Sequence, residues 1–382
     1  MKRISHSCVA ALIAILAALV ASGQEKTHRE WYQEGLEAAK AGDMAASAAA
    51  LEKALEINPY KINRPFFQYH LARALAAGGN RERAYSFLRD AWDEGIESFV
   101  IFQAARDPLF GDVSRDAEWI ELRRLAAELR LEVTELGNGL WQIDGTGASI
   151  LAHLDSSGWL LVDTGYPEAS AALLRTLDEI APGHEVETIV NTHGHEDHIG
   201  GNFAFPRATI FAHPRTLEMM RAPEPLVPGV PIDPKPDSAL PDVLVDGPVS
   251  IRRGSETVRV FPLPTHSGSD LVVAFDRAGV IHLGDDYFPD TSARIFPGAD
   301  APSFFEMVDR IFQASPSLTT VVTGHSTNAP IAKLRTAISN TKEIYDFVNA
   351  RLAAGDDLET ILETGEAKGY PADWLRHFAG SD

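Results

Sequence analysis

Cysteine is nearly absent from this sequence. The 382 residues contain one cysteine, Cys8, which lies inside an apolar stretch close to the N-terminus. A single cysteine cannot form a disulfide within its own chain, and removal of that stretch would leave no thiolate to bind a metal. A chain of this length can instead bury a core large enough to fold without disulfides.

Positive charge is also scarce. Lysine and arginine together number 34 against 54 aspartates and glutamates, which gives a net charge of −20. Proteins that bind nucleic acid neutralise phosphates with a basic surface, so the composition argues against a nucleic-acid partner. The fractions of apolar residues (45%) and charged residues (23%) are ordinary for a globular protein. The length favours two domains over one.

The N-terminus carries a long apolar run. Lys2 and Arg3 precede "CVAALIAILAALVA" (residues 8–21), and small residues continue to Gly23. The run matches the apolar region of a signal peptide and is shorter than the roughly 20 residues that span a membrane. We predict that residues 1–23 are a signal peptide, so that the mature protein has no stable membrane span and is periplasmic or secreted from a bacterial envelope. An uncleaved membrane anchor is the alternative.

Residues 24–130 are predicted to be helical throughout and to contain a repeat. Small and apolar residues recur 37 positions apart, which lets paired helices approach closely. The spacing resembles that of tetratricopeptide repeats, whose usual period is about 34, if "YKIN" (residues 60–63) lengthens one loop. A degenerate third unit is expected near residues 107–129. The first copy contains Trp31, Gly35, Ser47, Leu51, Ala54 and Pro59, and the second contains Ala72, Ala84, Leu88 and Ala91.

This resemblance implies a domain that docks a partner protein or a second subunit. Two clear repeats are fewer than the three that usually form a stable stack. A generic helical bundle is therefore the alternative.

From residue 131 the pattern changes to strands. Apolar runs separated by glycine-containing turns predict strands joined by hairpins, and later runs alternate with helices. Such an order implies a layered α/β domain. A proline-rich stretch, residues 221–247, is too long for a simple turn, and we expect a surface loop near a site. Strands are expected at 131–145, 148–165, 186–192, 208–213, 256–264, 271–275, 279–285 and 318–325, and helices at 168–181, 302–314, 332–367 and 371–378.

The segment "NTHGHEDHIGGN" (residues 191–202) concentrates three histidines and two carboxylates within six residues. Where a strand enters this loop, alternate side chains point the same way, so His193 and His195 can face one metal ion. Asp197 and His198 follow where the chain turns, and the glycines after them permit a close backbone approach. Imidazole and carboxylate ligands suit zinc best, with iron or manganese possible. A solvated loop or a closed structural metal site are the alternatives.

Four further candidates each follow an apolar run, where the loops of layered α/β domains assemble their sites. They are Asp163, His266, Asp285 and His325. We expect Asp163 to orient a ligand histidine, although a turn cap at the strand end is also possible. The adjacent Asp286 is the alternative to Asp285. The remaining candidates exceed what one ion needs and suit two ions that share a carboxylate; they are His193, His195, Asp197, His198, His266, Asp285 and His325.

This ligand pattern resembles that of the metallo-β-lactamase superfamily over about residues 131–345. The resemblance implies an αββα sandwich, preceded by the all-α tetratricopeptide-like domain and followed by a C-terminal helical extension at residues 346–382. Because Cys8 is the only cysteine, the lactamase branch with a cysteine ligand is excluded. By position, the resemblance implies two zinc ions, the first held by His193, His195 and His266, the second by Asp197, His198 and His325, with Asp285 bridging them as in the glyoxalase II-like branch.

The same resemblance implies a metal-dependent hydrolase. In the expected mechanism a metal-bound hydroxide, oriented by Asp197, attacks the carbonyl of an ester, thioester, lactone or lactam in a small molecule. Tyr166 and Tyr287 are expected to line the substrate pocket. Fold and metal do not select the substrate. One alternative is an iron-dependent enzyme that resembles the persulfide dioxygenases, and the other is a non-enzymatic protein that docks a partner through its helical repeats.

Overall fold

The computed structural model describes residues 26–59, 64–95, 98–225, 229–287, 289 and 301–380. The predicted signal peptide, with Cys8, lies outside these residues. No helix within the described ranges is both long enough and apolar enough to cross a membrane.

The described residues divide into two compact units. The first comprises the residues up to Glu94 together with Leu109–Gly111, and the second comprises Gly95–Pro108 and the residues from Asp112 onward.

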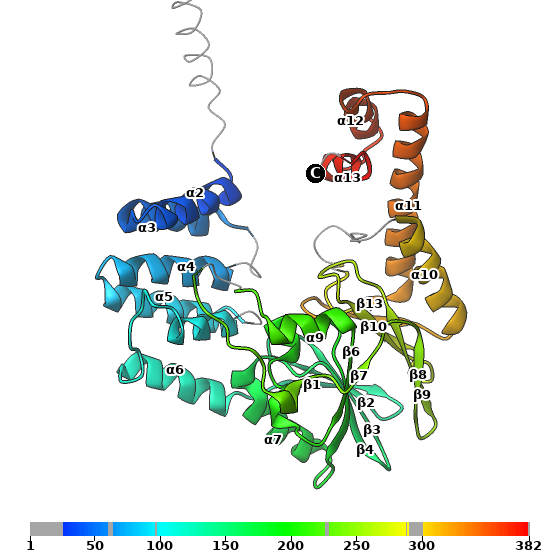
Figure 1. Ribbon diagram of the computed structural model, residues 1–382, viewed down its shortest axis with the longest axis horizontal. Coiled ribbons are helices and arrows are strands. Elements are labelled where there is room, and N and C mark those ends of the chain that lie inside the picture. Colours follow the sequence, from blue (N-terminus) through cyan, green and yellow to red (C-terminus); the bar gives the residue numbers. More distant parts are fainter. Residues whose placement is uncertain are drawn as a thin grey trace, which may run out of the picture. The chain divides into compact units, whose positions relative to one another are not determined.

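In its described part the first unit consists of helices that pack each on the next (Figure 1). Side chains that accept hydrogen bonds from backbone N–H groups cap three of these helices at their N-termini; the capping residues are Thr27, Asp43 and Asn80. The helices are α2 (His28–Lys40), α3 (Met44–Ile57), α4 (Arg64–Ala77) and α5 (Arg81–Asp93).

The repeat seen in the sequence coincides with the interior of the first unit. Gly35 lies against Leu51, and a Cβ at Gly35 would be only 2.6 Å from Leu51 Cγ. Ser47, Ala84 and Leu88 are fully buried as well. The all-helical region that we predicted is confirmed. Its identity as a tetratricopeptide array stays a prediction.

The second unit contains two sheets. The first places its strands in chain order, antiparallel from β1 to β4 and parallel from β4 to β7. The second has the order β13-β12-β11-β10-β9-β8, with β11 and β12 parallel and the other neighbours antiparallel. The strands of the first sheet are β1 (Glu132–Gly137), β2 (Leu140–Asp144), β3 (Ile150–Asp155), β4 (Gly158–Val162), β5 (Val186–Val190), β6 (Thr209–Ala212) and β7 (Val243–Leu244). Those of the second are β8 (Val249–Arg253), β9 (Glu256–Pro262), β10 (Leu271–Phe275), β11 (Val280–His282), β12 (Thr320–Val322) and β13 (Ala329–Pro330).

Helices of the second unit connect and cover these strands. The longer ones are α6 (Ala117–Glu128), α7 (Ser170–Ile180), α9 (Pro214–Arg221), α10 (Ala301–Ala314), α11 (Ile331–Ala353), α12 (Leu358–Glu366) and α13 (Ala372–Phe378). The short ones are η2 (Ser98–Ala105), η3 (Pro167–Ala169), α8 (Glu196–Ile199), η4 (Asn202–Ala204) and η5 (Asp237–Ala239).

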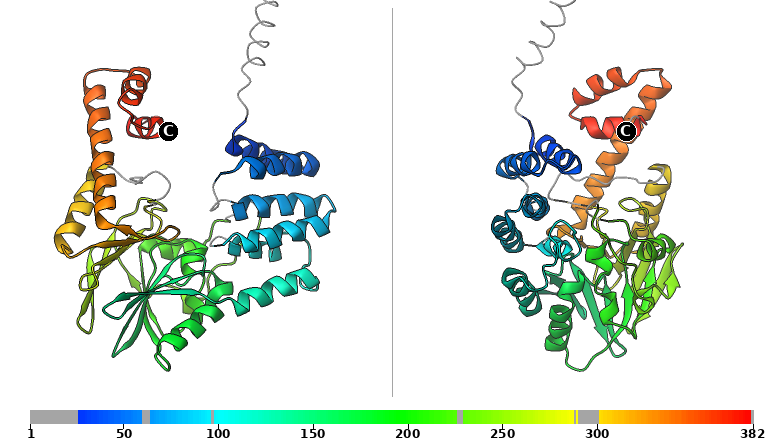
Figure 2. Two further views of the ribbon diagram at one scale, coloured as in Figure 1. Left: turned by 180° about the vertical axis from the view of Figure 1, so that it is seen from behind. Right: turned by 60° about the vertical axis from the view of Figure 1, so that its left-hand side comes forward.

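Three apolar clusters show how the layers stack. Between the sheets, Leu160 of β4 and Val273 of β10 belong to one buried cluster. The outer face of the first sheet packs against α7 through Leu173, and that of the second packs against α10 and α11 through Val308 and Leu334. Figures 1 and 2 show these helices on opposite sides of the paired sheets. The αββα sandwich that the resemblance implied is confirmed.

Two boundaries drawn from the sequence fall inside the second unit. The elements η2 and α6, which precede residue 131, belong to this unit and not to the helices before it. Residue 345 lies within α11, whose side chains join the same core as those of α10. Trp374 and Leu375 of α13 are buried in that core too, so the C-terminal helices extend the outer layer of the second sheet.

Candidate metal centre

The first two histidines of the motif lie in a loop. β5 ends before them, and residues 191–195 have no regular structure, so strand alternation does not set the directions of His193 and His195. The loop is held instead by Asp163, whose carboxylate accepts hydrogen bonds from the backbone N and Oγ1 of Thr192, each at 2.7 Å.

The next two motif residues, Asp197 and His198, lie on the four-residue helix α8. The chain behind this helix packs tightly against the loop that follows β4. Gly201 N donates a hydrogen bond to Gly165 O at 2.9 Å, and a Cβ at Gly201 would lie 2.3 Å from Thr164 O. The glycine therefore permits the close backbone approach expected from the sequence.

The remaining candidates follow strands of the second sheet: His266 comes after β9, Asp285 after β11 and His325 after β12. Asp270 fixes the first of these loops. Its carboxylate accepts hydrogen bonds from the backbone N–H groups of His266 at 3.1 Å and Ser267 at 2.8 Å. Strand ends and a local carboxylate thus bring residues far apart in the sequence to one edge of the two sheets.

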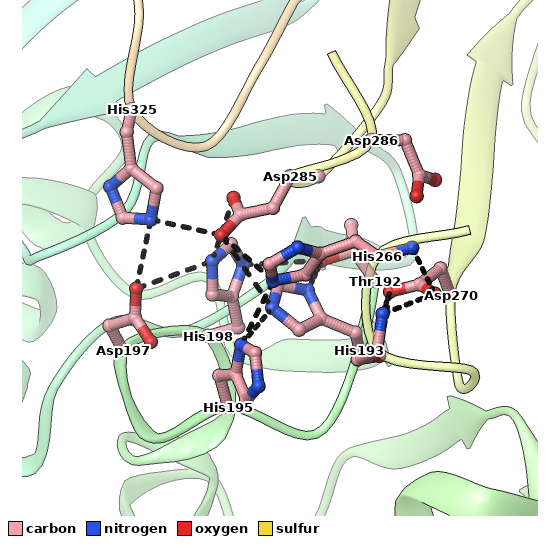
Figure 3. Close-up of polar contacts among 12 residues, drawn as sticks. Thr192, His193, His195, Asp197, His198, His266, Asp270, Asp285, Asp286 and His325 are labelled. Carbon is pink, nitrogen blue, oxygen red and sulfur yellow. Dashed lines mark hydrogen bonds and ion pairs between the residues drawn. The ribbon is translucent and has the colours of Figure 1, made fainter. Parts of the chain in front are cut away.

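The predicted ligands converge into two groups (Figure 3). Within each group the candidate ligand atoms lie within 4.8 Å of one another, and Asp285 belongs to both. The first ligand group consists of His193, His195, His266 and Asp285, and the second ligand group consists of Asp197, His198, Asp285 and His325.

The separations within these groups suit metal coordination. His195 Nδ1 lies 2.9 Å from His193 Nε2 and 3.2 Å from His266 Nε2. In the second ligand group, His325 Nε2 is 3.0 Å from Asp197 Oδ2. Ligand atoms bound to a tetrahedral zinc ion at about 2.0–2.1 Å lie about 3.3 Å from each other. A cation can therefore be accommodated with small adjustments of the side chains.

Two buried ligand atoms make no hydrogen bond with any described residue. They are His198 Nε2 and Asp285 Oδ1, which lie 3.3 Å apart. Buried polar atoms without hydrogen bonds are unfavourable, and a cation between them would coordinate both. The donor set thus fits a pair of metal ions that share Asp285.

Asp163 lies behind the second ligand group and orients His198. Its Oδ2 is 2.7 Å from His198 Nδ1, which leaves Nε2 facing the other ligands. Metal-binding histidines commonly use their second nitrogen in this way. Asp163 is fully buried and has a φ of 66°, a left-handed conformation that aspartate adopts more readily than most residues other than glycine.

Burial and neighbouring charges shift the pKa values of the ligand histidines in different directions. Burial, reinforced by neighbouring His198, holds the pKa of His193 well below its ordinary value, and burial also lowers the pKa of His195. Burial opposes the charged form of His198, but the carboxylates of Asp197 and Asp163 raise its pKa well above the ordinary value. Neutral imidazoles are ready metal ligands, whereas a cation must displace the proton of His198.

The structure also reveals contacts that the sequence did not indicate. A Cβ at Gly324 would lie 2.3 Å from Asp285 Oδ1 and 2.9 Å from His198 Cε1. A Cβ at Gly147 would lie 2.3 Å from the ring of Tyr166. In the sequence Gly324 stands directly before His325, but a glycine at a strand end is indistinguishable there from an ordinary turn residue.

Three other candidates contribute no atom to either ligand group. The carboxylate of Asp286 points away from both groups (Figure 3) and accepts a hydrogen bond from Thr265. Tyr166 is 2% exposed and stacks on Phe99 with ring centroids 5.5 Å apart. Tyr287 is fully buried in the core between the second sheet and its helices. Both tyrosine rings are buried, and their contact with substrate stays a prediction.

The similarity to known proteins covers the same part of the chain. The model of the family described as "Metallo-beta-lactamase superfamily" matches residues 144–325. A hydroxyacylglutathione hydrolase of Methylococcus capsulatus is 26% identical over 159 residues, which cover 42% of this chain and 55% of that protein. Human metallo-beta-lactamase domain-containing protein 1 is 46% identical over 66 residues, which cover 17% of this chain and 24% of that protein.

The chain therefore spans about half of the bacterial relative and about a quarter of the human one. Among solved structures, a metallo-beta-lactamase from Pontibacter korlensis is 21% identical and has a TM-score of 0.41. The similarity covers 55% of this chain and 98% of that one.

Proposed function

Because residues 144–325 form a metallo-β-lactamase superfamily domain, we propose that this protein is a dinuclear zinc hydrolase that cleaves an ester, thioester, lactone or lactam in a small molecule. The observation that carries the proposal is the pair of four-residue ligand groups that share Asp285. Seven converging donors exceed the needs of one ion.

The donor set favours zinc. Each ligand group combines imidazole nitrogens with carboxylate oxygens and contains no sulfur, a mixture that zinc binds in catalytic sites and that iron and manganese also accept. When bound, a pair of zinc ions lowers the pKa of a water ligand toward neutrality and polarises a carbonyl oxygen.

The side chains have separate tasks in this scheme. Asp285, which belongs to both ligand groups, would be a ligand of each ion. Asp197, with His325 3.0 Å from its Oδ2, would accept a hydrogen bond from the attacking water and so orient it toward the substrate. The side chain of His266 is 32% exposed, whereas that of His198 is fully buried. Substrate therefore reaches the centre from the side of His266.

One relative supports the proposed reaction type. The Methylococcus capsulatus protein is named for the hydrolysis of an acylglutathione, in which an acyl group bound to sulfur is transferred to water. Among the candidate substrates, thioesters are therefore the first to examine.

The proposal also includes location and partners. The apolar run at residues 8–21 supports export of the protein to the periplasm or medium. The helices α2 to α5 would dock a protein partner or a second copy of the chain. N-terminal sequencing of the protein from a bacterial host, together with light scattering of the purified product, tests both ideas. An uncut N-terminus would contradict export, and a monomer that captures no partner would contradict docking.

The decisive experiment joins metal content to activity. Zinc, iron and manganese are quantified in the purified protein, which is then assayed with lactam, lactone, thioester and phosphodiester substrates. We expect two zinc ions per chain and hydrolysis of at least one carbonyl substrate, both lost in His195→Ala and Asp197→Ala. Hydrolysis that persists after the metals are removed would refute the proposal, and an iron-loaded protein that consumes oxygen with a thiol persulfide would replace it.

A further inference from the structure

A nearly buried ion pair joins the proline-rich stretch to the metal-binding helix. Lys235 Nζ lies 2.5 Å from Glu196 Oε2, and the two side chains are only 12% and 10% exposed. Glu196 is the first residue of α8 and stands directly between His195 and Asp197 in the sequence. Lys235, which lies outside the ligand motif, therefore contacts a residue in the middle of it.

A lysine is seldom buried to this extent unless its charge is paired. The other carboxylate oxygen of Glu196, Oε1, is buried and makes no hydrogen bond with the described residues. Burial raises the pKa of nearby Glu168, and the charge of Glu196 contributes to that increase. Lys235 therefore pairs with a carboxylate that lies in acidic surroundings next to Asp197.

The segment that carries Lys235 is held by hydrogen bonds of its backbone at Lys235 and at Ala239. Lys235 N donates a hydrogen bond to Met220 O at 2.9 Å. Four residues later, Ala239 O accepts one from Asn202 Nδ2 at 3.2 Å. Asn202 also donates to Asn191 Oδ1 at 2.8 Å. The stretch between these bonds thus spans from the end of α9 to the turn that follows α8.

The backbone of this stretch is restricted as well. Pro234 and Pro236 flank Lys235, and each proline ring fixes its own φ near −65°. Their rigidity limits the positions that the lysine ammonium group can occupy. By contrast, α8 is four residues long and is too short to hold its own orientation without contacts to its surroundings.

We propose that Lys235 is a positioning residue for the metal centre, which fixes α8 through its ion pair with Glu196 and so sets the directions of Asp197 and His198. This inference rests on the proposed function only in that both ligand groups bind metal. It assigns to residues 235–239 the role of holding the helix that carries Asp197 and His198.

The test compares four variants of the full-length protein. Lys235→Met removes the charge but keeps an unbranched side chain, Lys235→Arg keeps the charge, and Glu196→Gln removes the other partner. Arg207→Met is the matched control, because its pair with Glu185 joins two side chains that are 79% and 61% exposed. Each protein is freed of metal and titrated with Co²⁺ against a competing chelator, while the visible absorption of the bound cobalt is recorded.

Loss of a group that supports metal ligands typically weakens metal affinity about 10–100-fold. We expect Lys235→Met and Glu196→Gln to weaken binding of one of the two cobalt ions by this factor and to change its absorption spectrum. Lys235→Arg should stay within about threefold of the wild type, which is small on that scale. Arg207→Met should bind both ions as the wild type does. A merely structural role would lower the melting temperature and leave the spectrum of the folded protein unchanged.

Wild-type cobalt affinities and an unchanged spectrum in Lys235→Met would overturn the proposal. If that variant does not fold, the same criterion applies to Glu196→Gln. A wild-type protein that binds two cobalt ions but hydrolyses no substrate in the panel would contradict the proposed function. It would not contradict the positioning role of Lys235.

Discussion

Replacement of Gly324 by alanine should disable the second ligand group through a single added methyl group. The new Cβ would lie 2.3 Å from Asp285 Oδ1 and 2.9 Å from His198 Cε1. The backbone at Gly324 is outside the left-handed region, so alanine meets no backbone strain there. The contact with the shared carboxylate is therefore the main perturbation.

The expected magnitude follows from these distances. Ordinary contact begins near 3.4 Å, so Asp285 Oδ1 must retreat by about 1 Å, whereas metal–ligand distances hold within about 0.2 Å. A displacement of that size removes a ligand from the second metal. We expect its affinity to fall at least about 100-fold, which equals about 2.7 kcal/mol.

The assay is a chelator competition with Zn²⁺, accompanied by a melting curve of the metal-free protein. Gly247→Ala is the control, because a Cβ there would have no atom within 4 Å. The control should bind two zinc ions as the wild type does. A folded Gly324→Ala protein that binds two zinc ions with wild-type affinity would show that Asp285 does not lie where the shared ligand must be.

Three further predictions concern support, charge and metal removal. Asp163→Asn should weaken zinc binding at the second ligand group about 10–100-fold, because an amide replaces the carboxylate that lies 2.7 Å from His198 Nδ1. An unchanged zinc affinity in the same competition assay would contradict the role of Asp163. Burial, with a smaller contribution from Arg73, lowers the pKa of His70 to about 4, so the folded state disfavours protonation of His70. The stability of the helical unit should therefore be retained above pH 6.5 and fall as the pH drops toward 4. The free energy of unfolding should fall by about 3 kcal/mol. Urea unfolding of the wild type and of His70→Gln at pH 7 and near pH 4 measures this loss, and the variant should lack it. An equal loss in both proteins would contradict the role of His70. Removal of metal by a chelator should lower the melting temperature of the second unit, because a ligand that binds only the folded state stabilises it; an unchanged melting temperature would mean that no metal had been bound.

The sequence predicted the main elements of the sandwich because their patterns are long or strongly apolar. β4 and β10 are continuous apolar runs, β5 is largely buried, and α7 has a clear helical face that contains Leu173 and Leu177. The short elements were not predicted. β7 and β13 have two residues each and α8 has four, so their conformation is set by contacts with the neighbouring chain and not by a local pattern.

The ligand candidates were identifiable because they cluster in one segment of the sequence or follow predicted strands. The direction of each imidazole ring could not be predicted. His195 faces its group with Nδ1, whereas His193 and His266 use Nε2, and these choices depend on loop hydrogen bonds such as that from Gly194 N to Ser269 Oγ. The contact of Gly324 with Asp285 likewise joins two loops from different strands, and no spacing in the sequence reports it.

The most direct test of the central claim is a crystal of the wild-type protein grown with zinc and measured at the zinc absorption edge. We expect two anomalous peaks about 3.5–4 Å apart, one in each ligand group, with the carboxylate of Asp285 in contact with both. A single peak, or two peaks of which only one contacts Asp285, would contradict it.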